Sequence, residues 1–152
     1  MSFTLRQRAL RLLAQREHAR AELKRKLAPH AETEDEIEAL LDDLVARRLL
    51  SDARYAEMRV SVRGGRYGNA RLVQELRQTG VDAEACAEAL AGAGDELARA
   101  HAVWLRKFSG PASDANDRAK QMRYLMHRGF SADVVRRVLR GEAPAADEQE
   151  DD

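Results

Sequence analysis

The sequence has little of what sheet proteins, disulfide-rich secreted proteins and membrane proteins need. Three Phe, three Tyr and one Trp are the only aromatic residues among 152, and β-branched residues are scarce, which disfavours a β-sandwich, a barrel or a wide parallel sheet. The single cysteine, Cys86, excludes an internal disulfide framework and any metal site with several cysteine ligands. No apolar run approaches the roughly 18 residues of a membrane span, and the N-terminus lacks the apolar core of a secretory signal. We therefore expect an all-α, cytoplasmic protein that makes no membrane contact.

The chain also lacks a net charge, because 26 Lys and Arg residues balance 26 Asp and Glu residues. The balance hides segments of opposite character, which follow one another as basic 6–27, acidic 32–43, basic 47–77, acidic 82–96 and basic 118–140. The C-terminal residues 142–152 carry six acids, which leaves 26 bases against 20 acids over residues 1–141. Alternation of this kind predicts one basic face, built from several helices, that suits a polyanion. The competing interpretation is an ordinary solvated helical surface.

A period of 49 residues runs through the sequence. It links apolar positions and helix N-cap positions, which are Leu27, Leu76 and Leu125 and then Thr33, Asp82 and Ser131. Such a period is typical of repeat proteins, in which one copy is too small to bury its own apolar residues. Gly80 and Gly129 fit the left-handed position of a tight turn between two helices. The first copy has Pro29 near this place, so we expect its turn to be built differently.

Helix start and stop signals divide each copy into three helices. The sequence therefore predicts three tandem three-helix repeats, with boundaries at residues 1–50, 51–93 and 94–141. Trp104 and Leu105 are expected in the core of the third repeat. Residues 142–152 are expected to form a disordered acidic tail, because Ala, Pro and acids cannot offset the entropy cost of ordering.

Several motifs resemble a known family. They are Leu50-Ser51-Asp52-Ala53-Arg54-Tyr55-Ala56, then Arg63, Gly68, Arg71, Leu72, Leu76, Gly80 and Val81, and finally Lys120, Arg123, Tyr124, Leu125, Arg128, Gly129, Phe130 and Ser131. Together with Ala9-Leu10 and Glu22-Leu23 in the opening segment, these residues resemble the RecX family over about residues 5–140. One departure is Ala19, where the family usually has a serine that would cap the second helix. The sequence therefore does not determine where that helix starts.

The resemblance implies both a fold and a function. The implied fold is an elongated, curved array of three-helix repeats, which agrees with the period. The implied function is regulation of DNA recombination and repair through binding of RecA and its filament on single-stranded DNA. Such a regulator inhibits filament extension, ATP hydrolysis, strand exchange and co-protease activity.

The basic segments supply the candidate partner-binding and DNA-binding residues, which are Arg63, Arg66, Arg71, Lys120, Arg123, Arg128, Arg136 and Arg137. Guanidinium groups bind carboxylates and phosphates through paired hydrogen bonds, so these residues suit an acidic protein rim, single-stranded or double-stranded DNA, or both. The alternative is that they pair with local acids along their own helices, at about 0.3 to 0.5 kcal/mol for each pair. Residues 118–140 contain a single acid, which weakens this alternative.

Three other local features favour a structural interpretation. The segment from Arg63 to Gly68 matches neither a P-loop nor a dinucleotide fingerprint and follows a helix, so we interpret it as a hinge between repeats. Tyr67 within it could stack on a base, but core packing or loop exposure is more common. The helix after Gly80 carries acids and no base, which suits a DNA major groove poorly.

No active site is predicted. The four histidines are scattered without metal-ligand spacing, and Cys86 lies on an apolar helical stripe without a neighbouring base. We expect a monomer that is not an enzyme and needs no cofactor or metal. Three functions remain open: a RecA inhibitor, a general nucleic-acid-binding protein, and a helical adaptor without a DNA-related role. We also expect the acidic tail to screen the basic face.

Overall fold

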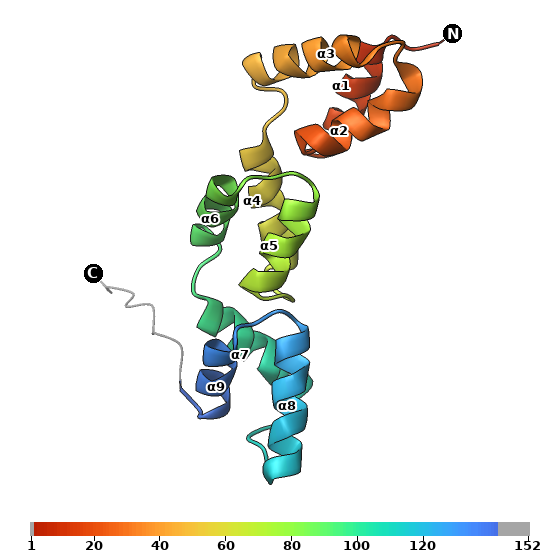
Figure 1. Cartoon of the computed structure of the whole chain (residues 1–152). Coiled ribbons are helices and arrows are strands. Elements are labelled where there is room, and N and C mark those ends of the chain that lie inside the picture. The colour runs from red at the N-terminus through yellow and green to blue at the C-terminus, as the bar shows by residue number, and fades with distance from the viewer. Residues whose placement is uncertain (1, 143–152) are drawn as a thin grey trace, which may run out of the picture. The chain divides into compact units, whose positions relative to one another are not determined.

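The structure is a computed structural model, and it describes residues 2–142 (Figure 1). These residues form nine α-helices and one short 3-10 helix, with no strand among them, which confirms the all-α expectation. The α-helices are α1 (Leu5–Gln15), α2 (Arg20–Leu27), α3 (Glu34–Ala46), α4 (Asp52–Arg63), α5 (Asn69–Gln78), α6 (Ala83–Ala91), α7 (Glu96–Lys107), α8 (Ala115–His127) and α9 (Ala132–Leu139). Residues 143–152, and with them most of the predicted acidic tail, lie outside the described part.

The repeated N-cap positions act as caps in all three copies. The side-chain oxygens of Thr33, Asp82 and Ser131 accept hydrogen bonds from backbone N–H groups three residues later, at 3.2, 2.8 and 3.3 Å. Each bond satisfies a donor that the first helical turn leaves unpaired. Thr4 and Gln7 form a reciprocal capping box at the start of α1.

The turns also follow the predicted pattern. Gly80 and Gly129 have φ values of 83° and 91°, which is the left-handed region that glycine tolerates. The corresponding turn of the first copy is instead a 3-10 helix over Ala28–His30, with Pro29 in its first turn. The first turn is therefore built differently, as the sequence predicts.

The open question about the second helix has a structural answer. Ala19 occupies the N-cap of α2 and offers no side-chain hydrogen bond. The backbone N–H of Arg20 instead donates to Oδ1 of Asp52, at 2.7 Å, so the first residue of α4 supplies the acceptor. A carboxylate at a helix N-terminus also interacts favourably with the helix dipole.

Backbone contacts divide the described chain into two compact units. The first contains residues 2–59 and 75–89, and the second contains residues 60–74 and 90–142. The boundary passes within α4 and α5, so the second repeat contributes residues to both units.

The first unit is held by an aliphatic core from the first three helices. Its fully buried residues are Ala9, Leu23, Leu27, Leu41 and Leu44. Each buried leucine contributes roughly 2 kcal/mol of transfer free energy. No aromatic residue belongs to this cluster, which fits a chain poor in aromatics.

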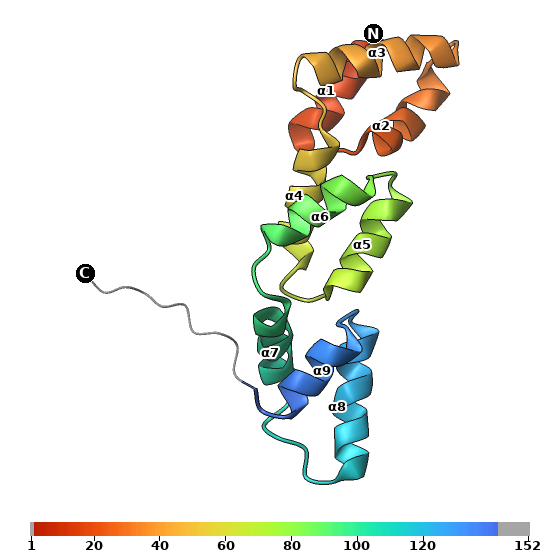
Figure 2. The ribbon, with the colours of Figure 1, turned by 60° about the vertical axis from the view of Figure 1, so that its left-hand side comes forward.

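The second unit has a mixed aliphatic and aromatic core, in which α9 packs against both α7 and α8 (Figure 2). Trp104 is buried there, and its indole N–H donates to Oε1 of buried Gln121 at 2.9 Å. The expectation for Leu105 is wrong, because this side chain is 57% exposed. Leu97, Val103 and Trp104 share the buried face of α7. Each successive residue of a helix is rotated by about 100°, which turns Leu105 to solvent.

Candidate functional site

Two glycines bring distant segments of the second unit into contact. The N–H of Gly68 donates to the carbonyl of Arg128 at 2.9 Å, which joins the α4–α5 loop to the α8–α9 turn. A Cβ on Gly68 would overlap the backbone of Gly129, and one on Gly129 would overlap the side chain of Arg71. Only glycine therefore allows this approach, and the sequence-based interpretation of a hinge is replaced by a packed junction.

A half-buried arginine on α7, Arg99, clamps the same loop. One terminal nitrogen of Arg99 on α7 donates to the carbonyls of Gly64 and Tyr67, at 3.1 and 3.0 Å. The other donates to the side-chain oxygen of Asn69. Burial lowers the pKa of the Arg99 guanidinium from its usual value, although an arginine stays charged at any physiological pH. Arg99 thus satisfies backbone carbonyls that the end of α4 leaves unpaired.

The junction gathers arginines around Tyr67. The guanidinium carbons of Arg63, Arg71 and Arg128 lie 4.4, 4.2 and 5.3 Å from the centre of the Tyr67 ring. Arg128 also lies 5.2 Å from the ring centre of Tyr124. Cation–π contacts at such distances hold the guanidinium groups in place, and a ring, unlike a carboxylate, leaves the charge of Arg128 unneutralised.

Next to this cluster the second unit has a groove of about 570 Å³. Its lining residues are Ser61, Val62, Gly65, Arg66, Val103, Arg106, Lys107, Tyr124 and Arg128. Four of these are basic and none is acidic. Within residues 2–142, none of the four basic residues forms an ion pair with a carboxylate. We refer to this feature as the basic groove.

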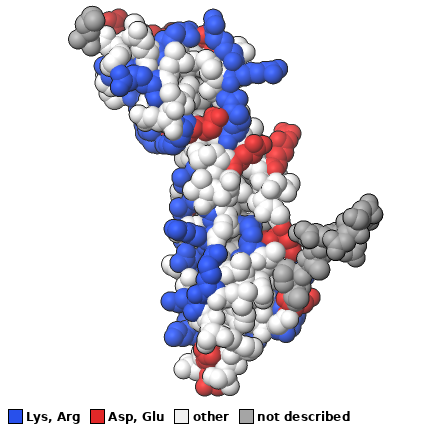
Figure 3. Space-filling model, turned by 180° about the vertical axis from the view of Figure 1, so that it is seen from behind, with Lys and Arg blue, Asp and Glu red and all other residues white. Residues whose placement is uncertain are grey.

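The ends of three helices position the bases of the basic groove. Arg106 and Lys107 belong to the last turn of α7, Arg128 is the C-cap of α8, and Arg66 follows the C-terminus of α4. Cations are favourable at helix C-termini, which explains locally why bases can gather there. In the lower part of Figure 3, Lys and Arg side chains gather along the left-hand edge, and the acidic side chains lie to the right of them or at the very bottom.

The structure divides the eight predicted residues into four groups. Arg66 and Arg128 line the basic groove, and Arg63 and Arg71 flank Tyr67 beside it. Lys120 and Arg123 are exposed on α8, Arg136 is exposed on α9, and none of them lines the groove. Arg137 is half-buried and pairs with Glu142 at 3.2 Å.

Sequence reasoning missed three important bases, Arg99, Arg106 and Lys107. They lie on α7, outside the three basic segments, and close to the acidic segment that ends at Glu96. A signal was present for the last two, because bases in the final turn of a helix complement its dipole. Arg99 carried no local signal, since its partners lie 30 to 35 residues earlier in the chain.

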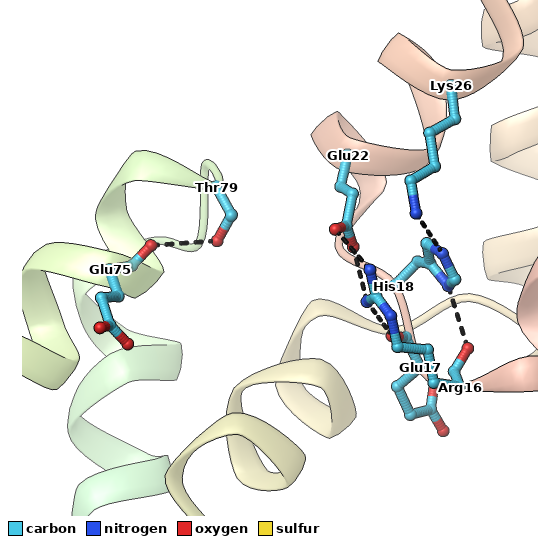
Figure 4. Close-up of polar contacts among 7 residues, drawn as sticks. All are labelled: Arg16, Glu17, His18, Glu22, Lys26, Glu75 and Thr79. Atoms are coloured by element: carbon cyan, nitrogen blue, oxygen red, sulfur yellow. Dashed lines mark hydrogen bonds and ion pairs between the residues drawn. The ribbon is translucent and has the colours of Figure 1, made fainter. Parts of the chain in front are cut away.

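The first unit contains a different polar cluster, built around buried His18 (Figure 4). Its Nδ1 lies 3.0 Å from the carbonyl of Arg16, and its Nε2 lies 3.0 Å from Nζ of Lys26. The ammonium group can only donate, so the neutral ring carries its proton on Nδ1. Desolvation lowers the pKa of His18, and the charges of Arg16 and Lys26 lower it further, against the opposing effect of the Arg16 carbonyl.

Glu22 completes this cluster. Its two carboxylate oxygens accept hydrogen bonds from Arg16 at 3.0 and 2.8 Å. Burial alone would raise the pKa of Glu22, but the hydrogen bonds and charge of Arg16 outweigh burial and lower it. The contacts of Arg16 and Glu22 are structural and leave no open site at His18.

Figure 4 also shows a contact elsewhere in the first unit, in which the Thr79 hydroxyl donates to the carbonyl of Glu75 and so closes the end of α5.

The described residues offer neither a cluster of metal ligands nor an exposed thiol. Residues 2–142 hold no group of three or more His, Cys, Asp or Glu side chains placed to bind a metal ion. Cys86 is buried, and burial raises the pKa of its thiol, so the reactive thiolate is disfavoured.

Comparison with known protein families decides what the chain is. The models of the first, second and third three-helix domains of RecX match residues 6–44, 51–90 and 94–139. The chain belongs to the RecX family. This confirms the resemblance found in the sequence and the three tandem three-helix repeats.

RecX proteins from several organisms match over nearly the whole chain. The regulatory protein RecX of Herminiimonas arsenicoxydans is 48% identical over 152 residues, which cover 99% of this chain and 98% of the relative. That of Leptothrix cholodnii is 54% identical over 138 residues, 90% and 88% of the two chains. The crystal structure of RecX from Lactobacillus salivarius shares the fold with a TM-score of 0.79 at 23% identity, covering 91% of this chain and 94% of the other.

The relatives are named as regulatory proteins, which agrees with a regulatory role. The helices formed by residues 2–142 include none with the length and apolar character that crossing a bilayer requires.

Proposed function

We propose that this RecX protein binds RecA and its filament on single-stranded DNA and inhibits filament extension. ATP hydrolysis, strand exchange and co-protease activity then fall because they depend on the assembled filament. The observation that carries the proposal is the basic groove, in which Arg66, Arg106, Lys107 and Arg128 line one hollow without a carboxylate. Family membership supplies the RecA context, and we place the activity in the cytoplasm.

The basic groove is suited to the acidic rim of a protein partner. A charged groove next to solvent raises the association rate and orients the partner, and arginine forks then pair with individual carboxylates. Val62 in the lining is 68% exposed, so the groove also offers an apolar contact that a protein partner could cover. Lys120, Arg123, Arg136 and Arg137 are proposed as additional contacts outside the groove, and Arg63 and Arg71 as contacts beside it, next to Tyr67.

The protein is proposed to act by occupancy and not by catalysis. Its bases are held by helix ends and aromatic rings, and Cys86 is buried with a raised thiol pKa. The ATP hydrolysis that it changes is the activity of RecA. No cofactor or metal enters this proposal.

The test is a titration of this protein into RecA that hydrolyses ATP on single-stranded DNA. We expect the wild type to suppress hydrolysis at equimolar or lower amounts, and Arg106→Glu to require at least about fivefold more protein. The matched control is Arg118→Glu, which makes the same charge change at an exposed position of α8 outside the groove. Unchanged hydrolysis at saturation with wild-type protein rejects the proposed function.

The position of the partner surface can be tested separately. If Arg123→Glu weakens inhibition more than Arg106→Glu does, the exposed face of α8 and not the basic groove is the main contact. If all three variants inhibit like the wild type, the charged surface of the second unit is not the RecA site.

Direct nucleic-acid binding is the second candidate function. It is favoured by two tyrosine rings, Tyr67 and Tyr124, that lie among the arginine side chains of the second unit. Nucleobases stack on such rings in proteins that bind single strands. Lys and Arg side chains that contact phosphates release the counterions of the DNA. The affinity of the protein for labelled oligo(dT), measured without RecA, should therefore fall steeply as the salt concentration rises. A flat salt titration, or no binding near physiological salt, removes this candidate.

A further inference from the structure

A second basic hollow occurs in the first compact unit. It is a groove of about 370 Å³ between α1 and the end of α2. Its apolar lining residues are Phe3, Leu12 and Leu27, and its basic lining residues are Arg8, Arg11, Lys26 and His30. Among residues 2–142, no carboxylate lines this groove. It therefore combines an apolar floor with a basic rim, a combination that the RecA proposal does not use.

One face of α1 forms a wall of this groove. Arg8, Arg11, Leu12 and Gln15 have the spacing that places residues on a single helical face. Helix α1 contains no acid, and the only basic residue of α1 outside the groove, Arg6, pairs with Asp43 at 2.7 Å. Within residues 2–142, Arg8 and Arg11 form no ion pair. Their charges are available to a partner.

The apolar part of the groove is partly open to solvent. Phe3 is 46% exposed, and the guanidinium carbon of Arg11 lies 4.3 Å from its ring centre. Leu12 is half-buried, and fully buried Leu27 lies at the floor. An exposed aromatic ring beside unpaired bases is an arrangement that a partner can improve, because covering the ring removes apolar surface from water.

The third basic residue of the rim, Lys26 on α2, is fixed in place. Nζ of Lys26 donates to Nε2 of His18 at 3.0 Å, so the ammonium is held at the groove without being neutralised by a carboxylate. Because this partner is uncharged, Lys26 adds a full positive charge to those of Arg8 and Arg11.

We propose that this groove binds an acidic peptide segment of a protein partner that carries a Leu or Phe anchor. The anchor would pack against Phe3 and Leu12, while carboxylates on either side pair with Arg8 and Arg11. The apolar side chains decide for a peptide, because a phosphate backbone gains nothing from covering exposed Phe3 and half-buried Leu12. The inference stands apart from RecA regulation, and its test contains no RecA.

The test measures fluorescence anisotropy of a labelled peptide, Asp-Glu-Asp-Leu-Phe-Glu-Asp-Glu, with full-length protein at 50 mM salt. We expect binding that weakens at 300 mM salt, because the charges are exposed. Arg8→Glu and Arg11→Glu should each weaken binding by about three- to tenfold, since each replaces an attraction by a repulsion. Phe3→Ala should weaken binding without changing its salt dependence.

The control is Arg25→Glu, which makes the same charge change at an exposed position of α2 outside the groove. A second peptide, with Asn and Gln in place of Asp and Glu, tests the need for carboxylates. Equal affinity of the wild type, Arg11→Glu and Arg25→Glu overturns the proposal, as does equal binding of the two peptides. Loss of oligo(dT) binding in Arg11→Glu with unchanged peptide binding would assign the groove to nucleic acid instead.

Discussion

The two compact units use their arginines and lysines differently. In the first unit most of them form ion pairs, such as Arg16 with Glu22, Arg20 with Glu38, and Arg54 with Glu17. In the basic groove of the second unit the bases contact tyrosine rings and backbone carbonyls, as Arg128 and Arg106 do. A carboxylate cancels the charge of its partner, whereas a ring or a carbonyl leaves it available.

The difference shows that the number of bases in a segment does not determine a binding surface. Residues 6–27 and 118–140 are both rich in bases. The acidic helix α3 packs near the first of these segments and pairs with Lys24 and Arg20. The pairing depends on which helices become neighbours, so it is a property of the fold.

The largest expected effect tests the glycine junction that builds the second unit's site. Gly68→Ala should destabilise the protein by about 2 to 4 kcal/mol, because the added Cβ overlaps the backbone at Gly129 and one segment must move. The measurement is urea unfolding followed by circular dichroism. Gly65→Ala is the matched control, since nothing lies within 4 Å of a Cβ placed there. Equal unfolding midpoints for both variants would show that the loop yields easily and that the junction is not tight.

The next effect tests the paired charges of the first unit. Glu22→Gln should lower the free energy of unfolding by about 1 to 2 kcal/mol, because it leaves Arg16 without its carboxylate partner at a site where Glu22 is buried. Glu34→Gln, which breaks the exposed pair with Lys24, is the comparison and should change stability too little to measure. Similar losses in the two variants would mean that burial does not distinguish these ion pairs.

Much of the fold followed from the sequence because its signals are local. Caps at Thr33, Asp82 and Ser131 and turns at Gly80 and Gly129 depend on neighbouring residues, and all five positions behave as predicted. The prediction that Leu105 is buried was wrong because sequence spacing alone did not show which side of α7 meets α9.

The site could be predicted only in part. Arg66 and Arg128 were found from the sequence, but their proximity depends on Gly68 meeting Gly129, about 60 residues away in the chain. Arg99 was missed because its hydrogen bonds reach the α4–α5 loop. The acceptor for α2 at Asp52 was missed for the same reason, since it comes from another repeat.

A pH titration of stability sharpens the comparison of the two units, because the first unit contains a buried neutral histidine, His18. The pKa of His18 is lowered in the folded chain from a usual value of 6.5, so the unfolded chain binds a proton more readily. The stability contributed by neutral His18 is thus present above about pH 6.5 and is lost as the pH falls towards the lowered folded pKa. The urea concentration at the midpoint of unfolding should therefore decrease as the pH is lowered from 8 to 5.

The variant His18→Gln identifies the source of that decrease. It should reduce the pH dependence between pH 6.5 and pH 5, whereas His30→Gln, at an exposed position, should leave it as in the wild type. A pH profile that is identical in wild type and His18→Gln would assign the acid sensitivity to other groups.

The smallest expected effect concerns the acidic C-terminus. Glu142, the last described residue, pairs with Arg137 and Arg140 at 3.2 and 3.3 Å, so at least one tail acid already neutralises bases of α9. The other five acids lie beyond the described residues. We predict that removing residues 142–152 strengthens oligo(dT) binding about two- to threefold at 50 mM salt and has no effect at 300 mM, because screening shortens the range of the charges. A full-length variant with Asn and Gln in place of these six acids should behave like the truncation, since charge and not chain length is responsible. If truncated, neutralised and wild-type chains bind equally at low salt, the bases of the second unit are not screened by the tail, and their availability depends on the fold alone.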